Sequence, residues 1–355
     1  MVVEPESLCW VEGRKVARRD APTWAETFGK FPALSYVVSD GGQGLQGGLD
    51  LTRGRRRAAG LALPLVQGLD VFHTLREGRL ALRATWRRVS EAMDRADAFG
   101  RTLKGRAWRG QSLQGHGGAA GAAWKRAEGL WDRALAAEAA WGEVRSALEL
   151  FTPRGRLSTR SHAEAAIARA LPRLAGPEWA KARRALGRRE TLTFLDRVEE
   201  RLAGLPLPPG ALEALLSLEG MRRGGRPSGG PAAEAAARGL ALARTVQLAK
   251  ADPHGCESQA RVRRVLRNAW RASSLVECLN SVARMQQTRH RRMTPGLLDL
   301  KRLYWNLRRF RTGPRRGKTP YELLGVDLAG LGWWELLRLS PEQLRQRLSA
   351  PGIAA

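Results

Sequence analysis

The chain has 355 residues, of which 43% are hydrophobic, so it is long enough and apolar enough to form one large folded domain or two ordinary ones. It carries 61 Lys and Arg against 34 Asp and Glu, a formal net charge of +27. Such an excess of positive charge predicts a polyanionic partner, and counterion release makes DNA or RNA the leading candidate.

The first part of the chain is expected to mix strands and helices. Two short strands, Leu8–Val11 and Lys15–Ala17, are predicted on either side of a turn at 12–14. Thr23 is the expected N-cap of a helix that runs to about Phe31.

Two apolar runs then follow at the spacing of a strand–helix–strand unit. Leu34–Ser39 is a near-continuous apolar run, which is typical of a strand buried on both faces. Glycines follow it, and a helix is expected from about Leu45. Leu65–His73 reads as another short buried strand. This alternation predicts a partly parallel sheet.

Strand signals disappear between residues 76 and 255, and this segment is expected to be a long all-helical insertion. Gly115–Gly121 and Gly224–Pro231 are expected to be loops. Five tryptophans occur along the first half of the insertion, and they could form a helical core or a base-stacking set. Because aromatic residues at helical spacing are more often core, the core is the favoured interpretation for Trp86, Trp108, Trp124, Trp131 and Trp141.

The last hundred residues are again helical in pattern. Residues 256–330 are expected to hold a helix with Glu277 near its start and then a basic segment, with breaks at Pro295 and at 312–320. The tail, 331–355, reads as a small amphipathic helix pair. The chain therefore divides into four predicted parts: 1–75, 76–255, 256–330 and 331–355.

Two carboxylates far apart in the sequence are candidates for metal chemistry. Asp40 follows an apolar strand and precedes glycines, where a carboxylate is open to a hard cation such as Mg²⁺. Glu277 shares one helix face with Asn280, Ser281 and Arg284. The alternatives are a turn aspartate that caps the next segment and a solvated helix face.

Asp70 and His73 form a second polar pair next to the sheet. They could bind a metal or stabilise the fold, and a supporting role is the favoured interpretation. Asn280 is assigned a similar supporting role, because it could orient Glu277 or hold a phosphate.

A dense basic tract runs from residue 284 to 318, with Tyr304, Trp305 and Phe310 interleaved. It has twelve Lys and Arg and a single acidic residue, Asp299. Cations at this density fit phosphate contacts, which position a protein without reading sequence. The residues expected to bind DNA are Arg284, Arg289, Arg291, Arg292, Lys301, Arg302, Arg308, Arg309, Arg315, Arg316 and Lys318.

Taken together, four segments resemble bacterial insertion-sequence transposases of the DDE class, whose catalytic domain is RNase H-like. These segments are 38–45, 69–73, 274–281 and the 317–325 ending Gly-Lys-Thr-Pro-Tyr-Glu-Leu-Leu-Gly. The resemblance implies an α/β fold that is mostly α by residue count. In it, an RNase H-like mixed sheet is interrupted by a long helical insertion and followed by C-terminal helices.

The resemblance also implies roles for particular residues. Asp40 would be the second aspartate of the catalytic triad and Glu277 its glutamate. Two Mg²⁺ (or Mn²⁺) ions, roughly 3.5–4 Å apart, would serve cleavage and transfer of DNA strands. No upstream aspartate matches the first of the triad, so we expect a chain truncated at its start and catalytically incomplete.

Two other functions stay open beside the transposase: a non-catalytic DNA-binding protein derived from that fold, and a helical RNA-associated protein. For a transposase, the resemblance implies transposon ends and target DNA as partners and a homodimer in a synaptic complex. The three cysteines, Cys9, Cys256 and Cys278, fit neither a disulfide framework nor a zinc site. With no signal peptide and no apolar run of roughly 20 residues, we expect a cytoplasmic, nucleoid-associated protein with no membrane partner.

Overall fold

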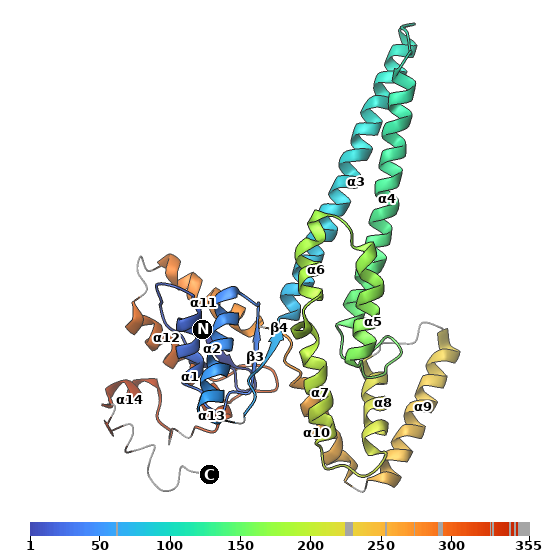
Figure 1. The fold of residues 1–355 in the computed structure, drawn as a ribbon. Helices are drawn as coiled ribbons and strands as arrows, with labels where there is room; N and C mark the ends of the chain where they lie inside the picture. Colours follow the sequence, from blue (N-terminus) through green and yellow to red (C-terminus); the bar gives the residue numbers. More distant parts are fainter. Residues whose placement is uncertain are drawn as a thin grey trace. The chain divides into compact units, whose positions relative to one another are not determined.

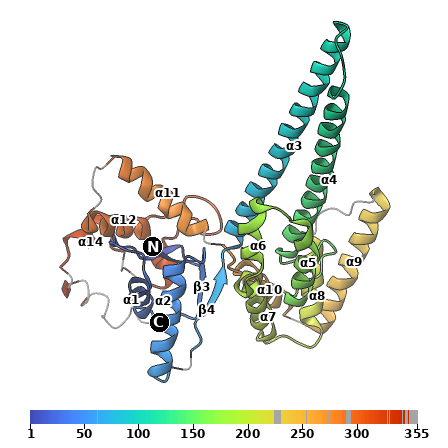
Figure 2. The same ribbon diagram turned by 45° about the horizontal axis from the view of Figure 1, so that its top comes forward.

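The computed structural model describes residues 1–61, 63–223, 230–252, 254–272, 274–289, 294–326, 328, 330–340, 342–343 and 346. The chain folds into two compact units. Unit 1 combines residues 1–66 with 272–355, and unit 2 is the continuous segment 67–271. Helices dominate both units (Figures 1 and 2). Over the described residues no helix is long and apolar enough to cross a membrane.

The strands form two small sheets among the described residues, not an RNase H-like sheet. One sheet pairs β1 with β2 and the other pairs β3 with β4. The predicted mostly helical composition is therefore confirmed, whereas the larger mixed sheet is not seen in this part of the chain. The four strands have the bounds β1 Val2–Glu4, β2 Cys9–Glu12, β3 Tyr36–Ser39 and β4 Val66–Leu69.

The first hairpin lies earlier in the chain than its predicted position. β1 and β2 are antiparallel, and no strand forms at 15–17. The turn is fixed by the Glu4 carboxylate, which accepts hydrogen bonds from the backbone N–H groups of Glu6 (2.9 Å) and Ser7 (2.7 Å). Behind β2, Gly13 lies against the Trp10 indole, where a Cβ would be 2.5 Å from Nε1. These local contacts outweigh the strand propensity of the 15–17 segment.

The next helix begins at an aspartate and not at Thr23. α1 spans Ala21–Gly29, and the Asp20 side chain accepts the Thr23 N–H at 3.1 Å. Pro22 lies in the first turn, where a missing N–H costs nothing, so the cap moves three residues upstream. The predicted strand at 34–39 and the helix after it are confirmed as β3 and α2, Gln43–Ala58.

A buried arginine lies at the edge of the small apolar core between α1, α2 and β3. The buried residues of this core are Phe28, Leu49 and Leu65. Arg56 on α2 is only 7% exposed, and its guanidinium donates to the carbonyls of Leu34 (2.6 Å) and Phe31 (2.9 Å). The charged head therefore satisfies loop carbonyls at the edge of this core instead of facing solvent.

Helix α2 approaches the segment before α1 so closely that only glycine fits at position 44. A Cβ there would lie 1.8 Å from the Arg19 carbonyl oxygen, which is backbone and cannot rotate away. We expect Gly44→Ala to destabilise unit 1 by about 1–3 kcal/mol, as overpacking does in other cores. Gly54→Ala is the matched control on the same helix, because nothing lies within 4 Å of its Cβ. It should be neutral or slightly stabilising, and urea unfolding of both variants measures the difference.

Unit 1 is completed by short helices from the C-terminal part of the chain. The breaks predicted at Pro295 and at 312–320 are confirmed, because α12 starts at Pro295 and no helix covers residues 308–319. In the tail, α14 is described, while much of 341–355 lies outside the described residues. The bounds are α11 Ser274–Arg289, α12 Pro295–Leu307, α13 Pro320–Leu324 and α14 Trp333–Arg338.

Unit 2 begins with two long antiparallel helices that run side by side (Figures 1 and 2). α3 spans Val71–Trp108 and α4 spans His116–Ala147. Ala120, Ala127 and Ala134 are buried and seven residues apart, so their small side chains form one continuous seam along α4. The loop predicted at 115–121 is corrected, because the turn lies at 109–115 and the later glycines are helical. Likewise, the strand predicted at 65–73 ends at Leu69, and residues 71–73 begin α3.

The rest of unit 2 is a compact helical body around a large apolar core. Trp141, Trp179 and Phe194 are buried at its centre, and the two tryptophan rings lie 5.8 Å apart. Residues 224–229 of the predicted 224–231 loop lie outside the described part, and α9 begins at Gly230. The remaining elements are α5 Arg160–Ala170, η1 Leu171–Arg173, η2 Pro177–Trp179, α6 Ala180–Leu186, η3 Arg189–Leu192, α7 Thr193–Ala203, α8 Ala211–Arg223, α9 Gly230–Ala251 and α10 Gly255–Arg267.

A buried glutamate joins α8 to α10. Glu219 is fully buried; its carboxylate pairs with Arg263 and with Arg222 at 2.9 Å, and Arg223 lies at 4.0 Å. Burial raises the pKa of Glu219, but the hydrogen bonds from Arg263 and Arg222 outweigh that effect and leave the pKa below its usual value.

A carboxyl whose pKa is lowered by folding stabilises the protein above its unfolded pKa, about 4.3. That stabilisation is lost as the pH falls from about 5 through the folded pKa. We therefore expect acidification below pH 5 to destabilise the native chain more steeply than the Glu219→Gln variant. Thermal melts of both proteins between about pH 3 and 7 check this, and parallel pH profiles would contradict it.

Candidate nucleic-acid interface

The basic segment of unit 1 is held to the first hairpin by a buried asparagine. Asn306, 1% exposed, accepts the Trp10 N–H at 2.8 Å and donates to the Trp10 carbonyl at 3.0 Å. Its amide therefore pairs with β2 as a neighbouring strand would. The Trp305 indole N–H adds a bond to the Leu8 carbonyl at 3.0 Å. Helix α12 is thus fixed to the hairpin by directional bonds as well as by apolar contact.

The apolar contact under these bonds is a small cluster. Trp10, Leu279 and Leu298 are buried together, so α11 and α12 both pack on the hairpin. Trp305 is partly buried against this cluster, whereas Tyr304 is 57% exposed and its ring meets that of Trp333. The neighbouring Cys9 is also buried, which raises the pKa of its thiol to about 11.

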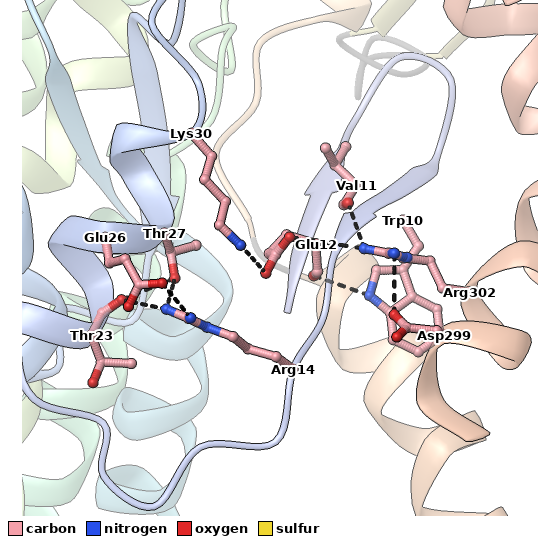
Figure 3. Close-up of polar contacts among 10 residues, drawn as sticks. All are labelled: Trp10, Val11, Glu12, Arg14, Thr23, Glu26, Thr27, Lys30, Asp299 and Arg302. Carbon is pink, nitrogen blue, oxygen red and sulfur yellow. Dashed lines mark hydrogen bonds and ion pairs between the residues drawn. The ribbon is translucent and has the colours of Figure 1, made fainter. Parts of the chain in front are cut away.

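Glu12, at the end of β2, pairs with two cations from different parts of unit 1 (Figure 3). Its carboxylate lies 3.0 Å from Nζ of Lys30, which directly follows α1, and 3.8 Å from Arg302 on α12. Arg302 also pairs with Asp299 at 3.1 Å and donates to the Val11 carbonyl at 3.2 Å. Arg302, a predicted DNA-binding residue, therefore has two acidic partners and a structural position.

The segment that follows α12 presents its cations differently. We call residues 308–318 the basic loop. Its two ends are bonded together, Phe310 N–H to the Lys318 carbonyl at 2.9 Å and Gly317 N–H to the Phe310 carbonyl at 2.8 Å. Arg315 ties it to the first hairpin by donating to the carbonyls of Glu6 (2.8 Å) and Pro5 (3.3 Å). The loop is therefore an ordered platform.

Most charges of the basic loop point to solvent without an acidic partner. Arg309 pairs with Glu322 at 2.9 Å. Within the described residues, no carboxylate lies within ion-pair distance of four other exposed cations: Arg308, Arg311, Arg316 and Lys318. An ordered, uncompensated cluster of this kind is what a polyanion binds.

The other residues predicted to contact phosphates lie on α11, on α12 or outside the described part of the chain. Arg284 is exposed on α11, and Lys301 is half-buried on α12. The Arg289 side chain, Arg291 and Arg292 lie outside the described residues.

The two candidate catalytic carboxylates lie in the same unit, and both are exposed. Asp40 directly follows β3, and its side chain accepts the Gly42 N–H at 3.1 Å, which is the turn geometry of a local cap. Glu277 lies in the first turn of α11. On that helix Leu279 and Ala283 are buried. Three residues of the predicted polar face, Glu277, Ser281 and Arg284, are exposed, and the neighbouring Cys278 is exposed as well.

The second polar pair, Asp70 and His73, lies in unit 2 at the N-terminus of α3. Asp70 is fully buried; Oδ1 accepts the Phe72 N–H at 2.7 Å and Oδ2 lies 2.8 Å from His73 Nδ1. The carboxylate thus caps α3 and orients the imidazole. Asn280, the third supporting candidate, is half-buried on α11.

In the part of the chain that the structure describes, no three His, Cys, Asp or Glu side chains gather as a set that could hold a metal ion. Neither Asp40 nor Glu277 therefore belongs to such a set among the described residues.

Sequence patterns did not identify Asn306 as a structural residue. The one indication in the sequence is a polar side chain between the apolar residues Trp305 and Leu307.

No protein-family model matches the chain, and no curated protein or solved structure matches it either.

Proposed function

We propose that unit 1 binds DNA through the basic loop, in a protein related to DDE transposases. The observation that carries the proposal is the set of four exposed cations without acidic partners on a loop tied to the first hairpin. Because the loop backbone is already ordered, less conformational entropy is lost when the cations meet phosphates. Such contacts give affinity and orientation with little sequence preference.

The test is a salt titration of the full chain with a fluorescein-labelled DNA duplex, read by anisotropy. We expect the logarithm of the association constant to fall linearly with the logarithm of salt concentration, with a slope of about −0.9 for each phosphate contacted. An affinity for DNA that does not change with salt concentration would contradict the proposal. A duplex RNA of the same length that binds more tightly than the DNA would favour the RNA-associated alternative.

Metal-dependent cleavage and transfer of DNA strands is a second candidate function. It is favoured by one observation: Asp40 and Glu277 are both exposed and both belong to unit 1. An RNase H-like frame that includes β3, and the pairing of two copies on DNA ends, are parts of this proposal.

Nicking of supercoiled plasmid in Mg²⁺ or Mn²⁺ tests the catalytic proposal. Asp40→Asn and Glu277→Gln should each abolish nicking while they leave DNA affinity unchanged. Asparagine keeps an acceptor for the Gly42 N–H, so the turn is preserved in the first variant. Nicking that persists in both variants would assign the activity to another protein or another site.

A further inference from the structure

The far end of the α3–α4 hairpin has a composition unlike the rest of that hairpin. Residues 98–127 contain no acidic side chain, although Asp97 and Glu128 flank them directly. The same stretch holds six cations: Arg101, Lys104, Arg106, Arg109, Lys125 and Arg126. None of the six has a carboxylate within ion-pair distance in the described structure. We call residues 98–127 the hairpin tip.

The hairpin tip also carries the most exposed large apolar side chain among the described residues. Trp108, the last residue of α3, is 90% exposed. The other tryptophans of the hairpin are less so: Trp141 is buried, the rings of Trp86 and Trp131 meet edge to face at 5.1 Å, and Trp124 is 40% exposed. The core interpretation of the tryptophan set therefore fits Trp141 and fails for Trp108.

The turn that presents Trp108 is ordered. The Arg106 guanidinium donates to the Ser112 carbonyl at 3.0 Å, across the turn. Gly110 and Gly115 take positive φ angles of 65° and 77°, which glycine adopts without strain. An indole held at a fixed position on a cationic, acid-free surface combines the two groups with which proteins bind unpaired bases: a stacking face and phosphate ligands.

We propose that the hairpin tip is a second DNA-contact site, which binds single-stranded DNA or unpaired bases. Trp108 stacks on a base, and Lys104, Arg109, Lys125 and Arg126, all exposed, contact the neighbouring phosphates. The occupant is a nucleic acid because the charge is uniformly positive. It is unpaired because the face of a base is open to an indole only outside the stack of a duplex. The proposal shares no residue with the basic loop, so either site can fail without the other.

The test compares Trp108→Ala with the full wild-type chain on a labelled oligothymidine and on a duplex of equal length. We expect Trp108→Ala to lose at least fivefold in affinity for the single strand, since stacking on one base contributes about 1–3 kcal/mol. Duplex affinity should change less than twofold. Trp108→Phe, which keeps an aromatic face, should recover most of the loss. Thermal melts confirm folding, which the exposure of this side chain predicts to be unaffected.

Charge variants separate phosphate contact from general electrostatics. Arg109→Gln should weaken single-strand binding more than Arg133→Gln, an exposed arginine of α4 outside the hairpin tip. Equal single-strand affinity of Trp108→Ala and wild type would overturn the proposal. So would equal losses on single strand and duplex. Binding to anionic phosphatidylserine vesicles that requires Trp108, with no effect on DNA, would instead assign the hairpin tip to a membrane surface.

Discussion

A chain in which Arg308, Arg311, Arg316 and Lys318 are all replaced by glutamine is expected to bind duplex DNA roughly a hundredfold more weakly than the wild type at physiological salt. The four cations are exposed, and none has an acidic partner among the described residues. Their charge is therefore available to phosphates, because no carboxylate of the described fold neutralises it. The fourfold replacement leaves Arg309 and Arg315 intact, because these two hold the loop in place.

The salt dependence distinguishes contact from general attraction. If each of the four cations contacts one phosphate, the slope of log affinity against log salt should become shallower by about 3–4. The replacement lowers the formal net charge from +27 to +23, because four cations are removed. A control with the same net charge is therefore needed.

The matched control removes four arginines scattered over unit 2: Arg87, Arg133, Arg173 and Arg261. Three of these pair with acids in the structure, Arg87 with Glu91, Arg173 with Glu143 and Arg261 with Glu257. We expect this control to bind DNA within a few-fold of the wild type. If both fourfold variants lose the same affinity, overall charge and not the basic loop is responsible.

The sequence predicted the helical elements of this chain better than its sheets. The 34–39 strand and the helix after it carry strong local signals, and both are confirmed. The first hairpin was misplaced because its turn depends on one carboxylate, Glu4, that accepts two backbone N–H groups. The loop expected at 115–121 was read from glycine content, yet the glycines after Gly115 are helical because buried alanines at 120 and 127 pack that segment against α3.

The candidate site was predictable in its charge but not in how that charge is used. Density of Lys and Arg located the basic tract, whereas pairing between distant residues decides which cations are free. Arg302 forms an ion pair with Glu12, some 290 positions away in sequence, and Arg309 forms one with Glu322. No local pattern reveals such partners. For Trp108, likewise, helical spacing favoured a core position. The residue is the last of α3, and its ring is exposed to solvent.

Replacing Asn306 with alanine is expected to destabilise unit 1 by about 2–6 kcal/mol. The Asn306 amide satisfies both backbone groups of Trp10, and the site is buried, so water does not replace it. An unsatisfied buried donor or acceptor costs about 1–3 kcal/mol, and here two are created. Asn306→Asp should be no better, because a carboxylate keeps the acceptor but loses the donor and buries a charge.

Hydrogen exchange locates this effect more sharply than a melt of the whole chain, because the chain has two compact units. Peptides covering residues 1–12 and 295–307 should lose protection in Asn306→Ala, while peptides from the unit 2 core keep theirs. Asn280→Ala, on α11 of the same unit, is the control and should leave protection of residues 1–12 unchanged. Since the basic loop continues directly from α12, the Asn306 variant should also bind DNA more weakly, although it removes no cation. Full retention of both protection and DNA affinity would show that β2 and α12 are held together by the apolar cluster alone.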